Sequence, residues 1–307
     1  MKKLFRLFLF SLSAILIPGI ITLIFTGGSD KGQRKMGIQI EQADGKYIDG
    51  EEYVMGMAAS ELSYIREKEA LKAWMIVCRT NLLKAVGRAK TVKESNLTLD
   101  YISQEKLMES NGKRSYMEYR NRLREASEET FGQVLVYEDE LIDALYHQVS
   151  GGETISSKEI YDVEVPYLKA VESPQDVESA EYLGVKMITY KECAQILSKN
   201  GKKETEKSCR KNLTVTNQTK HGYVKEVSTK KNSWIGEEWK ELFGLSSTCF
   251  SLENYEDQLR MVTLGRGHGM GLSLYGANAL AGDKKAEQIL SCYYPGVEID
   301  DMDSYLP

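Results

Sequence analysis

The chain has 307 residues, of which 42% are hydrophobic and 28% are charged. This is a globular composition, and it excludes a disordered chain. The net charge is -5, from 40 Lys and Arg residues against 45 Asp and Glu residues. A mildly acidic chain gives no support to a nucleic-acid-binding protein that works through a broad basic surface. With only 3 His and 5 Cys residues, a protein built on several zinc sites is also disfavoured.

The N-terminus combines a short basic head with a long apolar run. No charged residue interrupts the run from Leu7 to Phe25, which is long enough to cross a bilayer as a helix. A cleaved signal peptide is the alternative, but it usually has a shorter apolar core and ends at a site of small residues. We therefore predict a cytoplasmic head (1–6), a transmembrane anchor (7–26), a linker (27–36) and an extracytoplasmic domain (37–307).

The body of the chain mixes helix and strand patterns. In chain order, these patterns predict a strand at Ile38–Glu41 and another at Tyr47–Ile48, helices at Glu51–Glu61 and Lys68–Val86, an irregular stretch at 91–115, a helix from Tyr116 to Ala126, a hairpin of Val134–Tyr137 and Leu141–His147, a helix within 182–200, a hairpin of Leu213–Thr216 and Tyr223–Ser228, a strand at Met261–Leu264, and helices at Leu274–Ala281 and Lys284–Leu290. The second helix has an apolar stripe of Leu71, Trp74, Cys78, Leu82 and Ala85, which predicts a core element. Because no βαβ rhythm is present, we expect an α+β fold, with mixed helices and short antiparallel sheets around a substrate cleft and one N-terminal transmembrane helix.

The cysteines show no C-x-x-C spacing. Cys193 and Cys209 flank a polar loop and could be bridged if the body lies outside the membrane. The alternative is that most of the cysteines are small buried hydrophobic residues.

Glu61 is the first candidate for chemistry. It ends the run Tyr53-Val54-Met55-Gly56-Met57-Ala58-Ala59-Ser60, which is mostly small and apolar. A carboxyl group packed against such residues loses solvation, and its pKa rises. A carboxyl group that stays protonated near neutral pH can act as a general acid. The alternative is an exposed glutamate that caps a surface helix.

The second candidate is the segment His147-Gln148-Val149-Ser150-Gly151-Gly152-Glu153-Thr154. Gly151 and Gly152 allow backbone N–H groups to turn toward a ligand, and Ser150 and Thr154 offer hydroxyl groups. Taken alone, the segment is best interpreted as an ordinary loop.

The third candidate is the segment Gly265-Arg266-Gly267-His268-Gly269-Met270-Gly271-Leu272-Ser273-Leu274-Tyr275-Gly276-Ala277. Its alternating glycines fit neither a dinucleotide-binding fingerprint nor a phosphate-binding loop. Glycine weakens a strand, so close approach by a ligand or by another backbone is the expected reason for the pattern.

In this order, the three segments resemble the stage II sporulation protein D family, whose domain is also named for the amidase enhancer LytB. The resemblance runs from about Gly37 to Asp303. It rests on Tyr53-Val54-x-Gly56, Glu61, Glu69-Ala70-Leu71-Lys72-Ala73, Arg79-Thr80, Gly132-Gln133-Val134-Leu135, Ser150-Gly151-Gly152-x-Thr154, Pro166-Tyr167-Leu168, Gly267-His268-Gly269-x-Gly271-x-Ser273-x-Tyr275-Gly276-Ala277 and Tyr293-Tyr294-Pro295-Gly296. Each piece is weak alone, whereas the ordered set is specific.

The resemblance implies a membrane-anchored lytic transglycosylase that cleaves peptidoglycan strands free of stem peptides during sporulation engulfment. It places the catalytic glutamate on Glu61, because the 6-hydroxyl of muramic acid can replace the water that a second carboxylate would activate. Implied partners are glycan strands, the membrane and other membrane-anchored cell-wall hydrolases, with no nucleic acid. Substrate contacts are predicted from Arg79, His147, Ser150, Gly151, Gly152, Thr154, His268, Ser273 and Tyr275. Arg79 could pair with Glu61 or hold a sugar carboxylate, and the alternative is an arginine on the flank of the helix that only extends its charged end to solvent.

Three departures from the family pattern qualify this interpretation. Characterised relatives carry a His/Cys zinc cluster where this chain has Leu99-Asp100-Tyr101-Ile102-Ser103-Gln104, so we predict no zinc and no other cofactor. Leu274 stands where the family has glutamine, and Cys292 stands where it has histidine. These two changes leave open a diverged or inactive enzyme. The alternatives are a non-catalytic glycan-binding or amidase-enhancing module and a structural partner in a membrane complex.

Overall fold

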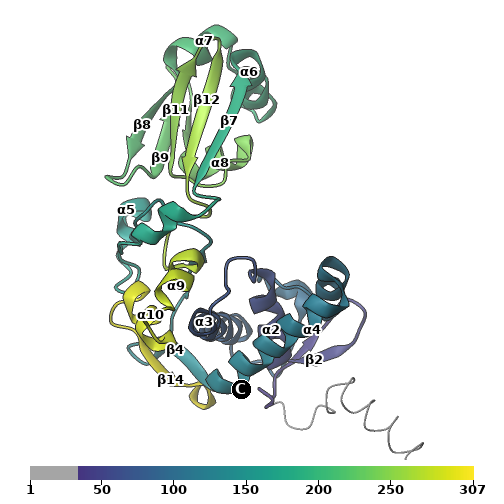
Figure 1. Ribbon diagram of the computed structural model, residues 1–307. Helices are drawn as coiled ribbons and strands as arrows, with labels where there is room; N and C mark the ends of the chain where they lie inside the picture. The colour runs from purple at the N-terminus through teal and green to yellow at the C-terminus, as the bar shows by residue number, and fades with distance from the viewer. Residues whose placement is uncertain (1–33) are drawn as a thin grey trace, which may run out of the picture. The chain divides into compact units, whose positions relative to one another are not determined.

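A computed structural model describes residues 34–307 of the chain. Within it, Met36–Pro307 form one compact unit (Figure 1). The predicted head, the predicted anchor and most of the predicted linker lie outside the described residues. Between residues 34 and 307, no helix is both long and apolar enough to cross a bilayer.

The described chain is an α+β protein, as predicted. Its α-helices are α2 (Gly50–Ser60), α3 (Lys68–Val86), α4 (Gln104–Thr130), α5 (Ser157–Tyr161), α6 (Tyr190–Lys199), α7 (Glu206–Asn212), α8 (Gly236–Phe243), α9 (Leu274–Leu280) and α10 (Ala286–Tyr293). Short 3-10 helices cover Glu94–Asn96, Pro174–Glu178 and Met302–Ser304.

The strands form small separate sheets rather than one continuous sheet. In spatial order they are β2 (Tyr47–Asp49), β1 (Gln39–Glu41) and β3 (Thr91–Lys93); β10 (Ser233–Ile235), β9 (Val224–Ser228) and β8 (Thr214–Gln218); β11 (Phe250–Tyr255), β12 (Gln258–Leu264) and β7 (Leu183–Thr189); β13 (Leu272–Ser273) and β6 (Tyr146–His147); and β14 (Glu298–Asp301), β4 (Gln133–Tyr137) and β5 (Glu140–Leu141). The expectation of antiparallel sheets holds for most pairs, but β1–β3 and β6–β13 are parallel.

Local sequence signals explain where the first two described helices begin and end. Asp49 caps α2 by accepting a hydrogen bond from the Glu51 N–H group, and the acidic first turn suits the positive end of the helix dipole. α2 ends at Ser60, so Glu61 follows it directly. α3 covers the predicted range and ends at Val86, and Gly87 caps it with a φ of 60° that suits glycine.

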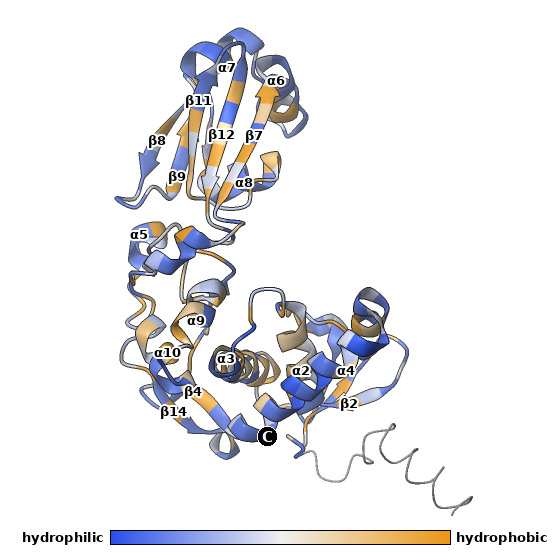
Figure 2. Cartoon of the chain, in the orientation of Figure 1, coloured by the Kyte–Doolittle hydropathy of each residue, from blue (hydrophilic) through white to orange (hydrophobic). Residues whose placement is uncertain are grey.

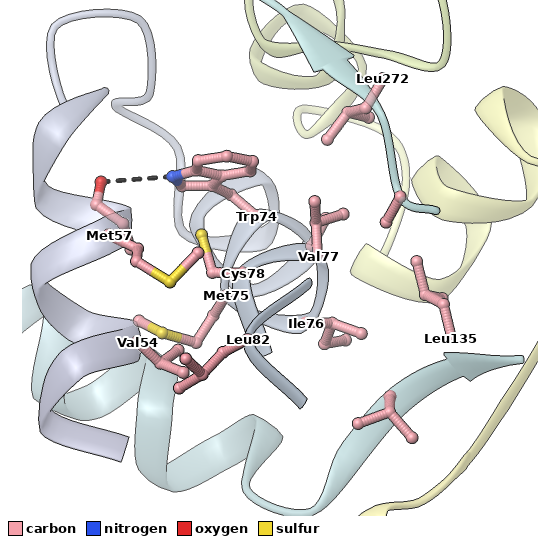
Figure 3. Close-up of a cluster of buried hydrophobic side chains, with 14 of the residues drawn as sticks. Val54, Met57, Trp74, Met75, Ile76, Val77, Cys78, Leu82, Leu135 and Leu272 are labelled. Atoms are coloured by element: carbon pink, nitrogen blue, oxygen red, sulfur yellow. Dashed lines mark hydrogen bonds between the residues drawn. The ribbon is translucent and has the colours of Figure 1, made fainter. Parts of the chain in front are cut away.

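α3 forms the centre of the larger core. Figure 3 shows Leu82 beside Val54 of α2, whereas Ile76 and Val77 point toward the side of the core that holds Leu135 of β4. A helix that buries apolar side chains on several faces belongs in the middle of a core, and α2, α4, α9 and α10 pack around this one. Of the predicted stripe, Leu71, Trp74, Cys78 and Leu82 are buried, whereas Ala85 is exposed.

Residues 183–264 carry a second apolar core. The strands β7, β12 and β11 lie side by side in Figure 1, and Figure 2 shows hydrophobic and hydrophilic bands alternating along β12. This alternation matches the alternating burial of the strand. Cys193 and Cys209 are free thiols buried in this core, and Cys78 and Cys249 are also buried. These four cysteines therefore act as small hydrophobic residues, whereas Cys292 is only half-buried.

Two predicted stretches differ from the structure. Residues 91–115 are not irregular, because they contain β3, a 3-10 turn and the first half of α4. That half of α4 buries only Leu107, so it lacks an apolar stripe, and Gly112 interrupts the helix with a φ of 75°. The predicted strand Leu141–His147 is also wrong. Its start pairs with β4 as β5, whereas its end pairs with β13 as β6.

Candidate active site

Glu61 occupies the buried environment that its preceding residues suggested. Only 8% of its surface is exposed. Burial raises the pKa of its carboxyl group, and the hydrogen bond that Gln148 Nε2 donates to Glu61 Oε1 at 2.9 Å opposes the rise. The carbonyl end of α2 acts in the same direction as burial, because it carries partial negative charge. The pKa of Glu61 is therefore shifted in the direction that a general acid needs.

The glycine-rich segment places Gln148 by packing closely against its backbone. Val149 and Arg266 exchange backbone hydrogen bonds of 3.1 and 2.7 Å, next to the parallel pair β6–β13. A Cβ atom on Gly265 would lie 2.5 Å from the Val149 carbonyl oxygen, and one on Gly271 would lie 2.0 Å from the Leu145 carbonyl oxygen. Any side chain at these two glycines would collide with backbone. The pattern therefore serves close approach by another backbone, one of the two reasons that the sequence left open.

The two predicted histidines lie together, with ring centroids 6.0 Å apart. His147 is buried, and its Nδ1 atom faces the Met270 carbonyl oxygen at 3.0 Å. His268 is half-buried, and its Nδ1 atom accepts a hydrogen bond from the Met270 N–H group. Burial lowers the pKa of His147 to about 3 and that of His268 to about 4. Both rings are therefore neutral near pH 7, and they cannot supply the acid.

A pocket of about 560 Å³ lies close to Glu61, although Glu61 is not itself among the residues that line it. Its lining includes Gln148, the residue whose amide holds Glu61, together with His268 and the half-buried Tyr146. Ligand pockets in proteins are usually of about 300–1,000 Å³, so this one has the size of a small-molecule site. This pocket is therefore the candidate for the expected substrate cleft, and Gln148 connects its wall to Glu61.

Charged groups around Glu61 act on its carboxyl group in opposite directions. Asp100 and Glu181 raise the pKa of Glu61, whereas Arg266 lowers it. Arg266 Nη1 lies 3.2 Å from Glu181 Oε2, so these two charges largely offset each other. Asp100 is exposed, lines the pocket and accepts a hydrogen bond of 3.2 Å from the Tyr146 hydroxyl group.

Aromatic stacking holds the loop of residues 99–104 on α2. The rings of Tyr101 and Tyr53 stack with centroids 4.4 Å apart, and the Ile102 N–H group donates to the Gly56 carbonyl oxygen at 3.2 Å. A Cβ atom on Gly56 would meet the Tyr101 ring at 2.2 Å, which explains the glycine in the helix. Among residues 34–307, no group of three or more His, Cys, Asp or Glu side chains is arranged to hold a metal ion. The absence of zinc stays a prediction.

Arg79 does not pair with Glu61, which corrects the expected ion pair. Arg79 Nη2 and Nε instead bond both carboxylate oxygens of Glu51 at 2.6 and 2.9 Å. Arg79 Nη1 donates to the backbone carbonyl groups of Thr130 and Gln133. The Arg79 side chain has no exposed surface, so it offers nothing to a sugar in this structure. Its position on the buried side of α3 explains the difference.

Ser150 and Ser273 turn inward to a buried carboxylate, Asp176. The Ser150 N–H group donates to Asp176 Oδ2 at 2.7 Å. Burial raises the pKa of Asp176, whereas the neighbouring Ser150, Ser273 and Ser173 side chains oppose that rise. Asp176 Oδ1 itself has no hydrogen-bond partner among the described residues. Ser273 also caps α9 by accepting a hydrogen bond from the Gly276 N–H group. Neither predicted serine has exposed surface, so both act inside the protein.

The remaining predicted contacts of this segment are also taken up internally. The N–H group of Gly151 donates to the Tyr223 hydroxyl group, and that of Gly152 donates to Ser150 Oγ. Thr154 is buried and its Oγ1 atom accepts a hydrogen bond from a backbone N–H group. Tyr275 is half-buried and its N–H group donates to the Gln148 carbonyl oxygen at 3.0 Å, next to the pocket.

Sequence reasoning did not single out Gln148, Asp100 or Asp176. Gln148 follows a predicted residue directly, so its inclusion in the loop motif was the available signal. Asp100 lies in a stretch that we considered only for missing metal ligands. A lone aspartate such as Asp176 gives no pattern at all, because its partners come from segments far apart in the chain.

The fold and the site define an α+β protein with a buried glutamate of raised pKa, which Gln148 links to a pocket of ligand size. Residues 42–137 match the family model described as SpoIID, Stage II sporulation protein. The chain is 30% identical over 267 residues to Stage II sporulation protein D of Bacillus subtilis (strain 168), a match that covers 83% of this chain and 76% of the relative. It is 29% identical to Stage II sporulation protein D of Bacillus amyloliquefaciens, with 83% and 75% covered. An uncharacterised protein of Brachyspira hyodysenteriae is 27% identical, with 82% and 66% covered.

The chain therefore belongs to the SpoIID family of stage II sporulation proteins, and the family resemblance seen in its motifs is confirmed. The matched range of the family model includes α2, Glu61 and the loop that carries Asp100.

Proposed function

We propose that this protein is a membrane-anchored lytic transglycosylase that cleaves peptidoglycan strands free of stem peptides during sporulation engulfment. The state of Glu61 carries the proposal: its carboxyl group is buried, has a raised pKa and accepts a hydrogen bond from Gln148, which lines a pocket. The apolar run of residues 7–26 serves as the anchor and leaves the body outside the cell membrane. Other anchored cell-wall hydrolases, which remove the stem peptides, act as partners.

The proposed reaction needs one group that moves a proton in both directions. Protonated Glu61 gives its proton to the bridging oxygen, and the bond from that oxygen to the anomeric carbon breaks. The Glu61 carboxylate then takes the proton of the muramic acid 6-hydroxyl group, while the 6-hydroxyl oxygen forms a bond to the anomeric carbon. The product is a 1,6-anhydro end, and the attack within one sugar gains the advantage of proximity.

Mass spectrometry of products from purified stem-free strands tests the proposal. Anhydro ends, formed by the wild-type protein and not by Glu61→Gln, are the expected result. Reducing ends in place of anhydro ends imply hydrolysis and contradict the lytic reaction. Binding of strands without any cleavage supports the alternative, a non-catalytic glycan-binding or amidase-enhancing module.

A further inference from the structure

Asp100 differs from the other carboxylates near the Glu61 pocket because its charge is not compensated. Asp143 also lines the pocket, but its Oδ2 atom lies 2.9 Å from Lys84 Nζ. Glu181 is paired with Arg266 at 3.2 Å. Among the residues that the structure describes, Asp100 has no cation within ion-pair distance. Asp100 is exposed, and its carboxyl group is open to the pocket.

The position of Asp100 is fixed from two sides. Tyr101, the next residue, stacks on Tyr53 of α2 with rings nearly parallel, at 2°. On the other side, the Tyr146 hydroxyl group donates to Asp100 Oδ2, and the Tyr146 ring packs edge-on against Trp74 at 4.3 Å. A hydrogen bond to a neutral donor orients this carboxylate without neutralising it.

The same contacts tie Asp100 to the helix that presents Glu61. Trp74 Nε1 donates to the Ala58 carbonyl oxygen at 3.2 Å in the last turn of α2, as the dashed line in Figure 3 shows. Glu61 is the first residue after that turn. One framework of α2, Trp74 and Tyr146 therefore supports both carboxyl groups, and a group held in this way needs little reorganisation during a reaction.

We propose that Asp100 is a second catalytic group of this pocket, an ionised carboxylate that stabilises the positive charge developing at the anomeric carbon. The inference rests on the proposed function, because bond cleavage at a glycosidic centre passes through an oxocarbenium-like transition state. The leaving oxygen takes the bonding electron pair and the Glu61 proton. Asp100 forms no covalent bond, and the 6-hydroxyl oxygen supplies the new bond to the carbon.

A second consequence of the same charge concerns the acid itself. The negative charge of Asp100 raises the pKa of Glu61, and removing it lowers that pKa. Glu61 must be protonated to act, so the alkaline limb of the rate profile should move to lower pH in Asp100→Asn. Other titratable groups that interact with Glu61 stay in place in this variant: Glu181, Arg266, Tyr64, Tyr146 and Cys78.

The test compares Asp100→Asn with Asp300→Asn. Asp300 is a matched control, because it also accepts a hydrogen bond from a tyrosine hydroxyl group, that of Tyr305 at 3.0 Å, and it does not line the pocket. The kcat and KM for anhydro-end formation are measured across the pH range. Asp100→Asn should lose about 10²-fold in kcat at its own optimum, as when one preorganised electrostatic group is removed, with its alkaline limb at lower pH and KM little changed.

Tyr146→Phe gives a graded check, because it removes the orienting hydroxyl group and keeps the ring against Trp74. It should lose less kcat than Asp100→Asn. If the wild-type protein cleaves strands and Asp100→Asn matches the Asp300→Asn control, the role of Asp100 is refuted and the proposed function stands. A loss confined to KM also overturns it. A wild-type protein that leaves strands intact, or releases reducing ends, overturns the proposed function and this inference together.

Discussion

The two ends of α2 each carry a buried glutamate, and the two are treated in opposite ways. Glu51 lies in the first turn and accepts hydrogen bonds from Arg79 Nε and Nη2. It accepts a further hydrogen bond from the Ser127 hydroxyl group. Glu61, just past the last turn, accepts one hydrogen bond from the neutral amide of Gln148. The carboxylate charge of a buried glutamate is thus fully compensated at the first end of α2 and barely compensated at the other end.

The difference separates stability from reactivity. A buried charge that keeps its partner is stable in one protonation state, whereas removal of the partner is costly. A buried carboxyl group without a cation favours the neutral form, so it keeps a proton that it can give away. The helix dipole adds to the contrast, because it favours negative charge at Glu51 and disfavours it at Glu61.

The largest expected effect comes from replacing Glu61, the glutamate at the end of α2 that we propose to be reactive. Glu61→Gln keeps the shape and can still bond Gln148, but it has no proton to transfer. Anhydro-end formation should fall by at least about 10²–10⁴-fold, the contribution of one positioned acid/base group. Turnover of purified strands measures this, with Glu109→Gln on the exposed face of α4 as the control. Cleavage by a folded Glu61→Gln protein at the control rate would rule out Glu61 as the acid.

The same substitution should not destabilise the protein. Because the pKa of Glu61 is raised on folding, its stabilising contribution is complete below the unfolded pKa and is lost as pH rises through the folded pKa. Glutamine carries no charge at any pH. We therefore expect Glu61→Gln to have a Tm at neutral pH equal to or above that of the wild type, and the difference should shrink on acidification. A lower Tm at neutral pH would contradict this view of the site.

The next largest effect comes from removing Arg79, the partner of Glu51 at the other end of α2. Arg79→Ala leaves Glu51 charged and buried without its partner, so the free energy of unfolding should fall by about 3–5 kcal/mol. Urea denaturation measures it. Arg124→Ala is the control, because Arg124 is about half exposed and lies 3.9 Å from Glu128, so its loss should cost less than about 1 kcal/mol. If Arg79→Ala folds as stably as the control, the Glu51–Arg79 pair is not the structural element that we describe.

The sequence predicts those features of this contrast that depend on neighbouring residues, and it does not predict those that depend on tertiary packing. Helix α3 was predicted with its bounds because helical periodicity is local, and Glu61 was found because its own preceding residues are small and apolar. The partner of Arg79 was assigned wrongly, because Glu51 and Glu61 lie on the same helix and no sequence pattern says which end faces α3. Only the packing of α2 on α3 decides it.

The roles of the two polar segments needed the fold for the same reason. Ser150 and Ser273 meet at Asp176 although more than one hundred residues of chain separate them. The predicted hairpin strand Leu141–His147 ends in β6, whose parallel partner β13 is equally distant in sequence. Pairings of this kind leave glycine and serine patterns in the sequence, but they do not show whether those residues face a ligand or another part of the chain.

A smaller effect is expected from Gln148→Leu, which removes the one hydrogen bond that the Glu61 carboxyl group accepts. Gln148→Leu deletes the hydrogen bond that lowers the pKa of Glu61, so this pKa should rise further. The alkaline limb of the rate profile should move to higher pH, opposite to its shift in Asp100→Asn. The maximal rate should also fall, by up to about 10²-fold, because the acid is less well oriented. A pH series of initial rates tests this beside Gln218→Leu on the exposed part of β8. A limb that stays in place or moves to lower pH would exclude the role assigned to Gln148.

The smallest effect concerns Asp176, a third buried carboxylate that has hydroxyl groups and no cation as partners among the described residues. Tyr293 belongs to the outer part of this cluster, since its hydroxyl group lies 2.8 Å from Ser173 Oγ and is buried. Tyr293→Phe removes one neutral hydrogen bond and leaves Asp176 with its serines. The free energy of unfolding should therefore fall by only about 1 kcal/mol, and cleavage per folded molecule should not change. Tyr305→Phe is the control, because its hydroxyl group bonds Asp300 in an exposed setting and should matter less. A loss as large as that of Arg79→Ala would show that the hydroxyl cluster acts as one cooperative unit, in which case a buried carboxylate without a cation can be as structural as Glu51.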